Sequence, residues 1–218
     1  MHGSYQSSVR KILGPAERIL FSRLKTPQKI QDYLDKLPIN FELSGETYMS
    51  PRRVIEERRA HCFEGALFAA AAFAYHGQSP LLMDFRTVPE DEDHVVALFK
   101  QSGLWGAVSK TNHAILRYRD PVYESPRELA MSYFHEYLEW NGNKSLRAYS
   151  RPFDVSRFAP HTWITEEKDL VLLVDALDST RHFPIAPQKN LRLLRRGTPV
   201  EIRAMKTTEW TRGGKLYK

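Results

Sequence analysis

The first third of the chain carries hydrophobic positions at helical spacing. Within residues 27–37, four apolar side chains fall on one helix face: Ile30, Tyr33, Leu34 and Leu37. The pairs Thr26-Pro27 and Ser50-Pro51 each combine an N-cap hydroxyl with a proline at the first helical position. They predict helices that begin at residues 27 and 51. A short amphipathic helix is expected over 15–24, after a flexible arm formed by residues 1–14.

Residues 62–77 are apolar on nearly every side. Their sequence, CFEGALFAAAAFAYHG, is rich in alanine, the best helix former, and it ends at His76-Gly77, a glycine stop signal. A helix that is hydrophobic all round is buried. The segment is therefore predicted to be the central helix of the fold.

Strand-like patterns follow this helix. Four apolar runs predict strands, of which the second and third are joined by a tight turn: residues 80–87, 94–100, 104–109 and 112–118. Later signals predict helices from Pro126 and over 166–179, and a last strand over 198–206.

This order of elements predicts an α+β fold. We expect a core over 15–125, in which the buried central helix packs on an antiparallel sheet, with extra helices at both ends. Residues 126–218 are expected to form a helical and strand extension that packs on this core and ends in a basic tail.

Composition narrows the protein class. The chain has 218 residues and one cysteine, so it can form neither an internal disulfide nor a multi-cysteine zinc site. Its longest apolar run, 66–75, is too short to cross a bilayer, and residues 1–11 lack an apolar stretch of signal-peptide length. These features predict a cytoplasmic protein without membrane contact.

The net charge of +6 is concentrated near the C-terminus. Eight basic residues contribute to it: Arg192, Arg195, Arg196, Arg203, Lys206, Arg212, Lys215 and Lys218. Apolar residues interleave with them and no nucleic-acid motif accompanies them, so a solvated basic end is expected rather than a nucleic-acid site.

The single cysteine, Cys62, is a candidate nucleophile because it stands at the predicted start of the central helix. A helix N-terminus and a nearby imidazolium both favour the thiolate. The basic lead-in 58–61 indicates that solvent reaches this end of the helix. His94 opens a strand directly after the acidic run 90–93 and is the preferred partner. His61 is adjacent, but neighbouring helical residues diverge by about 100°, so it is not expected to pair with the thiol.

The segment SPRRVIEERRAHCFEGALFAAAAFAYHGQSPLLMDF resembles the core of the transglutaminase-like superfamily, which has a papain-like cysteine fold. The resemblance covers residues 26–110 and is that of a divergent member of the bacterial type. In the family a histidine begins one strand, a tryptophan lies on the return strand, and an aspartate follows four residues later. His94 and Trp105 match the first two positions, whereas Ser109 stands at the position of the aspartate.

The third member of the predicted site is therefore open. Ser109 could orient the His94 imidazole only weakly, and Asn112 is close enough in sequence to do so instead. Asp120 lies farther along, and if it were the third member, His113 would be the base. The candidate catalytic residues are thus Cys62, His94, Ser109 and Asn112, with His113 and Asp120 as alternatives.

The resemblance implies a cysteine hydrolase or acyltransferase that forms a thioester from an amide or other acyl donor, with a peptide or protein substrate. No cofactor or metal is expected, and the run 90–93 lacks the ligand spacing of a calcium loop. Three alternatives remain. They are an inactive scaffold that binds a protein or anionic partner, a metal site formed by Cys62, His94 and an acidic residue of 90–93, and nucleic-acid binding by the basic tail. The sequence makes no prediction of oligomeric state.

Overall fold

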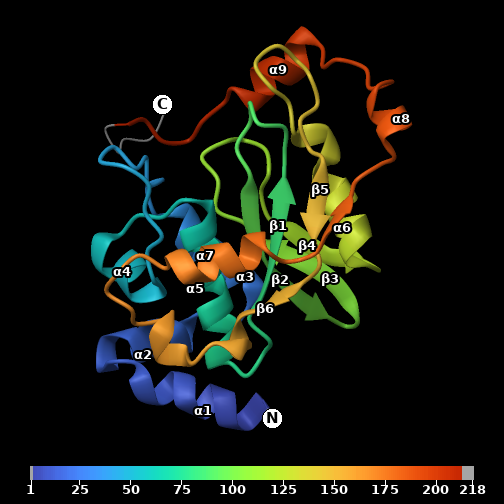
Figure 1. Ribbon diagram of the computed structural model, residues 1–218. Helices are drawn as coiled ribbons and strands as arrows, with labels where there is room; N and C mark the ends of the chain where they lie inside the picture. The colour runs from blue at the N-terminus through green and yellow to red at the C-terminus, as the bar shows by residue number, and fades with distance from the viewer. Residues whose placement is uncertain (1, 213–218) are drawn as a thin grey trace.

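A computed structural model describes residues 2–212 (Figure 1). The fold is α+β. Within the described residues, seven strands form one antiparallel sheet in the order β4-β3-β2-β1-β5-β7, and β6 pairs with β1 on the same edge as β5. The strands are β1 (Leu81–Arg86), β2 (His94–Gln101), β3 (Leu104–Val108), β4 (Arg119–Tyr123), β5 (Ala148–Ser150), β6 (Phe153–Asp154) and β7 (His182–Pro184).

Helix α5 (Cys62–Tyr75) packs on one face of the sheet and is buried from Phe63 to Ala74. Side chains alternate across a strand, and the sheet residues that pack in the same core as α5 include Leu82, Val95, Ala97 and Phe99. Five further helices lie on this side: α1 (His2–Ile12), α2 (Pro15–Arg23), α3 (Pro27–Asp35), α4 (Pro51–Glu57) and α7 (Val171–Asp178).

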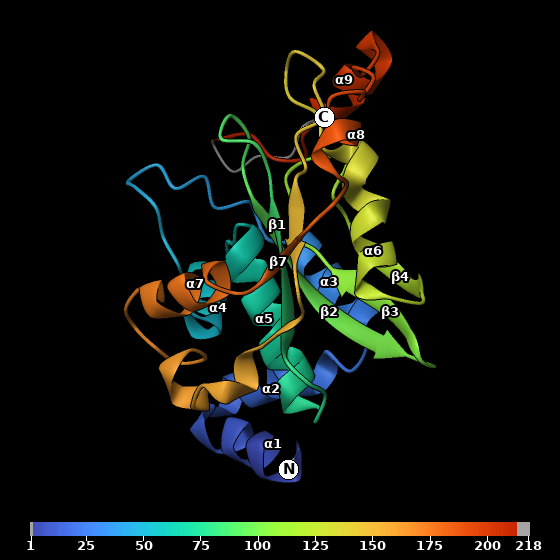
Figure 2. The same cartoon turned by 45° about the vertical axis from the view of Figure 1, so that its right-hand side comes forward.

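The opposite face of the sheet is covered by α6 (Pro126–Tyr133) and the 3₁₀ helix η1 (Phe134–Glu136). Figure 2 shows the sheet between α5 and α7 on one side and α6 on the other. The remaining elements are η2 (Val155–Arg157), η3 (Pro160–Thr162), α8 (Gln188–Leu191) and α9 (Pro199–Met205). No helix among the described residues is long and apolar enough to span a membrane.

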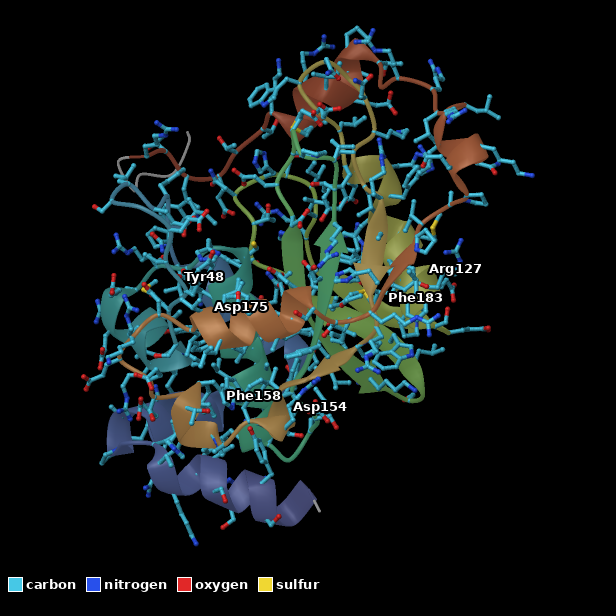
Figure 3. The ribbon with its side chains drawn as sticks, in the orientation of Figure 1. Tyr48, Arg127, Asp154, Phe158, Asp175 and Phe183 are labelled. Atoms are coloured by element: carbon cyan, nitrogen blue, oxygen red, sulfur yellow. The ribbon has the colours of Figure 1, made fainter. Side chains whose placement is uncertain are left out.

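A backbone hydrogen bond joins α7 to the loop before α4. Leu170 N–H, at the N-cap of α7, donates to Tyr48 O at 3.0 Å. Figure 3 shows the labelled Tyr48 directly above α7, the helix that carries Asp175. This contact helps to fix the segment 40–49, which also contacts the first turn of α5.

The predicted helix starts are confirmed where a hydroxyl precedes a proline. The side chains of Thr26 and Ser50 accept hydrogen bonds from Lys29 N and Arg53 N, at 3.3 and 3.4 Å. They cap α3 and α4 as expected. The central helix also begins and ends within a residue or two of its predicted limits.

Three local predictions were wrong. Residues 2–12 form helix α1 instead of a flexible arm, because Val9 and Leu13 are buried in the core. Residues 112–118 form a loop, and the next strand, β4, begins at Arg119. Residues 199–205 form helix α9 rather than a strand, and Thr198 N–H is bonded by the Glu201 carboxylate in the first turn of that helix.

The extension beyond residue 125 is part of the sheet and does not only pack on it. Its strands β5 and β6 pair directly with β1, and β7 pairs with β5. Of the predicted basic tail, Lys215 and Lys218 lie outside the described residues.

Candidate active site

Three chain segments meet at one end of the sheet, the upper end in Figure 1. Only residues 76–80 join α5 to β1, so β1 begins beside the C-terminus of α5 and ends toward its N-terminus. β2 starts at that same end, and the hairpin turn at 102–103 returns β3 to it. The first turn of α5, the start of β2 and the end of β3 therefore converge.

Cys62 is the first residue of α5 and is half-buried. The preceding residue, His61, is the N-cap and has an extended backbone with φ −94° and ψ −172°. The N–H groups of a first helical turn have no partner within the helix, and together with the helix dipole they favour an anion. The Cys62 sulfur thus lies where a thiolate is stabilised.

Glu64 stabilises this helix start from within the core. Its carboxylate is fully buried and accepts hydrogen bonds from four groups: His61 N at 2.9 Å, Met49 N at 3.1 Å, Thr47 Oγ1 at 2.9 Å and Asn40 Nδ2 at 3.2 Å. Burial alone would raise the pKa of Glu64. The hydrogen bond and charge of the His61 ring, with the backbone N–H groups, outweigh burial and lower it.

The His61 imidazole lies between this carboxylate and the thiol. Its Nδ1 is 4.0 Å from Cys62 Sγ, and its Nε2 is 2.8 Å from Thr47 O and 3.3 Å from Glu64 Oε1. The sequence-based expectation that His61 would point away was wrong. The 100° divergence applies between two helical residues, whereas His61 is the extended residue before the helix.

His94 opens β2 and is buried. Its Nε2 is 2.8 Å from Ser109 Oγ, and that hydroxyl donates its one proton to Leu116 O. Ser109 Oγ must therefore accept from His94 Nε2–H. This assignment fixes the tautomer of His94 and leaves Nδ1 as the ring nitrogen able to exchange a proton with the thiol.

Both imidazoles act on Cys62. Burial by itself raises the pKa of the thiol, but hydrogen bonds and positive charge from His61 and His94 outweigh burial. They lower the pKa of Cys62 to about 5. For His61, burial lowers the pKa, and hydrogen bonds and charge from Cys62 and Glu64 raise it to about 11 overall. A thiolate beside a charged imidazole is the favoured state of this group.

Gln31 of α3 holds the Ser109 backbone with both ends of its amide. Ser109 N–H donates to Gln31 Oε1 at 3.0 Å, and Gln31 Nε2 donates to Ser109 O at 2.8 Å. The next residue, Lys110, is buried against Gly65 of α5, where an added Cβ would meet Lys110 Cβ at 2.4 Å. Gln31 and Gly65 thus fix the end of β3 close to the middle of α3 and the first turn of α5.

Leu116 supplies the carbonyl that accepts from Ser109, and its backbone is strained. Its φ of 58° lies in the left-handed region, which an L-residue with a bulky side chain rarely adopts. The strained conformation is held by a 2.6 Å hydrogen bond from Leu116 N to Glu136 Oε2. Glu136 in turn pairs with Arg119 at 2.6 Å. The loop that orients Ser109 is therefore fixed from η1.

The structure brings together Cys62, His94 and Ser109 but places the remaining candidates elsewhere. The Asn112 amide donates to Trp210 O at 3.1 Å and accepts from Trp210 N at 2.7 Å. His113 Nδ1 bonds Met205 O at 2.8 Å. Both residues thus fasten the C-terminal segment to the loop 112–118, and Asp120 is exposed on β4.

Sequence reasoning missed His61, Glu64 and Gln31. A signal existed for two of them. Glu64 stands three residues after His61, which is the spacing of a capping box, and Gln31 is a polar residue beside Ile30 on the apolar face of α3. Nothing in the local sequence indicated that the His61 ring would turn toward the thiol.

The acidic run 90–93 is used in local structure. Asp93 accepts from Thr87 N at 2.8 Å, and Asp91 bonds the Ser145 hydroxyl. Among residues 2–212, no three His, Cys, Asp or Glu side chains are grouped so that they could hold a metal ion.

Comparison with known proteins adds no assignment to this geometry. No protein-family model matches the chain, and no curated protein matches it.

Proposed function

We propose that this chain is a cysteine enzyme of the transglutaminase-like type that forms a thioester between Cys62 and an amide or related acyl donor. A peptide or protein is the proposed substrate. The observation that carries the proposal is the thiol at a helix N-terminus beside two imidazoles, one of which, His94, is oriented by the Ser109 hydroxyl.

In the first step, the Cys62 thiolate attacks the carbonyl carbon and a C–S bond forms. The electron pair of the C=O bond moves to oxygen, and the Cys62 backbone N–H at the start of α5 is placed to receive that charge. No proton need move before attack, because the thiol is already ionised at neutral pH.

In the second step, the tetrahedral intermediate collapses and the C–N bond breaks. His94 gives the leaving amine the proton on Nδ1, which it received from the Cys62 thiol when the thiolate formed, while its Nε2–H stays on Ser109 Oγ. Water or a second amine then attacks the thioester carbon, and His94 Nδ1 takes up the proton that the attacking group loses. The C–S bond breaks, the acyl product leaves, and Cys62 returns to the thiolate. Water gives a peptidase or amidase reaction, and an amine gives acyl transfer.

The proposal is tested by measuring the rate of Cys62 alkylation by iodoacetamide against pH. The chain has one cysteine, so the modified thiol is identified without a background from others. The folded protein should show an inflection near the pKa of about 5 given by the two histidines. The same chain in denaturant is the control and should inflect near the ordinary thiol pKa of about 8.5. Capture of an acyl-enzyme with p-nitrophenyl acetate, seen by intact mass, should follow the same pH dependence.

The competing function is an inactive scaffold, for which the replacement of the family's aspartate by Ser109 is the supporting observation. An inflection near 8.5 in the folded chain, without an acyl-enzyme, would support the scaffold and overturn the enzyme. An inflection well below that value, with an acyl-enzyme, would leave the scaffold without support.

A further inference from the structure

His61 and Glu64 form a second arrangement around the thiol that the proposed reaction does not use. The His61 ring contacts both of the other side chains: Cys62 Sγ lies 4.0 Å from His61 Nδ1, and His61 Nε2 lies 3.3 Å from Glu64 Oε1. They all belong to residues 61–64, so the start of one helix fixes their relative positions.

The hydrogen bonds define which atoms carry protons. His61 Nε2 faces two acceptors, Thr47 O at 2.8 Å and the Glu64 carboxylate, so it carries a proton. Nδ1 is then left for the sulfur. It accepts from a thiol when the ring is neutral and donates to a thiolate when the ring is charged. The second form has a positive ring between two anions.

Glu64 makes the charged form of His61 favourable. Its carboxylate is completely buried, and besides the ring it is satisfied by backbone and side-chain donors that remain in place. A buried anion that keeps its hydrogen bonds stabilises a positive charge beside it. Glu42 places a second negative charge near the ring at a longer distance, with its Oε1 3.6 Å from His61 Nε2.

His94 has a different environment. Its Nε2 is bonded to an uncharged hydroxyl, Ser109 Oγ, and no carboxylate contacts the ring within the hydrogen bonds and ion pairs that the structure describes. Both rings lower the pKa of Cys62, but of the two only His61 has a carboxylate partner among these contacts, whereas His94 is oriented by a hydroxyl.

We propose that the two histidines divide the work of the site. His61, charged by Glu64, holds Cys62 as the thiolate, and His94, oriented by Ser109, carries the proton to the leaving group and back. No proton leaves His61 during the cycle, and every bond made or broken in the reaction is the same as in the proposed function, on which this inference rests.

Three groups titrate or carry charge around His61 in the described structure: Cys62, Glu64 and Glu42. The sulfur of Cys62 is faced by His61 and His94, and the buried hydroxyl of Tyr137 lies within the field of the thiolate. Burial and then the negative charge of Cys62 hold the pKa of Tyr137 well above its ordinary value, so Tyr137 stays neutral. The two imidazoles are thus the groups whose removal tests the division.

The test compares His61→Asn with His94→Asn in the iodoacetamide pH profile and in acyl-enzyme turnover with p-nitrophenyl acetate. Asparagine is a favoured N-cap, and the residue 61 backbone N–H keeps its bond to Glu64, so the helix start is retained. In His61→Asn the inflection should rise from about 5 to about 7 or higher, which lowers the thiolate fraction at about pH 6 roughly tenfold. In His94→Asn the inflection should rise less, while turnover is lost.

His76→Asn is the matched control. His76 follows the other end of α5, about 20 Å from Cys62 at 1.5 Å per residue, and its ring bonds Phe21 O at 2.8 Å. It should leave both the inflection and the turnover as in the wild type.

A measurement on the wild-type chain keeps the test independent of folding of the variants. When Cys62 is alkylated its negative charge is lost, so the His61 ring should lose its proton at a distinctly lower pH, as followed by NMR of the imidazole protons. An unchanged titration of His61 overturns the inference. So does a His61→Asn profile that matches the wild type, or a larger rise in His94→Asn. Each of these can occur while the wild-type inflection stays near 5, in which case the proposed function stands and only the division of work fails.

Discussion

Ser109→Ala tests whether a single uncharged hydroxyl orients the proton carrier. The substitution removes Ser109 Oγ, which accepts from His94 Nε2 at 2.8 Å and donates to Leu116 O. Two polar groups lose their partner at a position that is 1% exposed. An unsatisfied buried group costs about 1–3 kcal/mol, so we expect the free energy of unfolding to fall by at least about 1 kcal/mol.

The effect on catalysis follows from the same bond. A neutral hydrogen bond contributes about 0.5–1.5 kcal/mol net, and each 1.36 kcal/mol is tenfold in rate. Losing the bond that fixes the His94 tautomer should therefore slow acyl-enzyme turnover about tenfold. The iodoacetamide inflection of Cys62 should change little, because the hydroxyl carries no charge.

The assay pairs urea unfolding with turnover of p-nitrophenyl acetate at neutral pH. Ser150→Ala is the control, because its buried hydroxyl accepts from Asp84 N at 2.9 Å and takes no part in the described hydrogen bonds of Cys62, His61 or His94. It should lower stability without slowing turnover. If Ser109→Ala loses stability as Ser150→Ala does and keeps the wild-type turnover, then Ser109 does not orient His94 and the reasoning is refuted.

Two further predictions concern the residues that hold the site. Gln31→Leu removes both hydrogen bonds to the Ser109 backbone, so turnover should fall by a factor similar to that in Ser109→Ala. The free energy of unfolding in urea should fall by about 1–3 kcal/mol. Wild-type turnover in this variant would contradict a role for Gln31 in positioning Ser109. Glu64 has a folded pKa below its unfolded value of about 4.3, so its contribution to stability is complete above about pH 4.3 and is lost as pH falls through the lower folded pKa. Glu64→Gln should therefore weaken the fall in stability over that acid range, measured by urea unfolding at a series of pH values, and an unchanged slope would count against the assignment.

The parts of the fold that the sequence predicts well are those with a local signal. Thr26-Pro27 and Ser50-Pro51 contain both the cap and the first helical residue, and the helix starts are found there. Thr198-Pro199 is the same signal, with Glu201 completing a capping box, and the expectation of a strand at this position overlooked it. Where a cap and a proline coincide, the chain specifies its own helix start.

The parts that the sequence predicts poorly depend on distant residues. Tyr5, Val9 and Leu13 do recur at helical spacing, but a short helix owes its stability to packing. In α1 this packing includes contacts with α5 and η3. The loop 112–118 has a strand-like composition. It is instead held by the left-handed Leu116 and by its contacts with η1 and the C-terminal segment. Neither set of partners is visible in the local pattern.

The candidate site divides in the same way. Cys62 at a helix start and His94 at a strand start follow from local patterns, and their proximity follows from the short connections between α5, β1 and β2. To predict that Ser109 accepts from His94, one must know where the Ser109 hydroxyl proton points. That direction depends on the distant acceptor Leu116 O. To predict that His61 contacts the thiol, one must know the direction of the ring of an extended N-cap residue. No rule of helical spacing gives that direction.

The absence of an aspartate at residue 109 has a physical explanation on our proposal. Where one imidazole both holds the thiolate and carries the proton, a carboxylate on its far nitrogen stabilises its charged form. In this chain the carboxylate is Glu64, and it acts on the other histidine, His61. His94 then needs only a fixed ring orientation, which Ser109 supplies because its hydroxyl donates to Leu116 O and accepts from His94 Nε2–H. A serine at residue 109 is therefore compatible with an active thiol, provided that residues 61 and 64 remain a histidine and a glutamate.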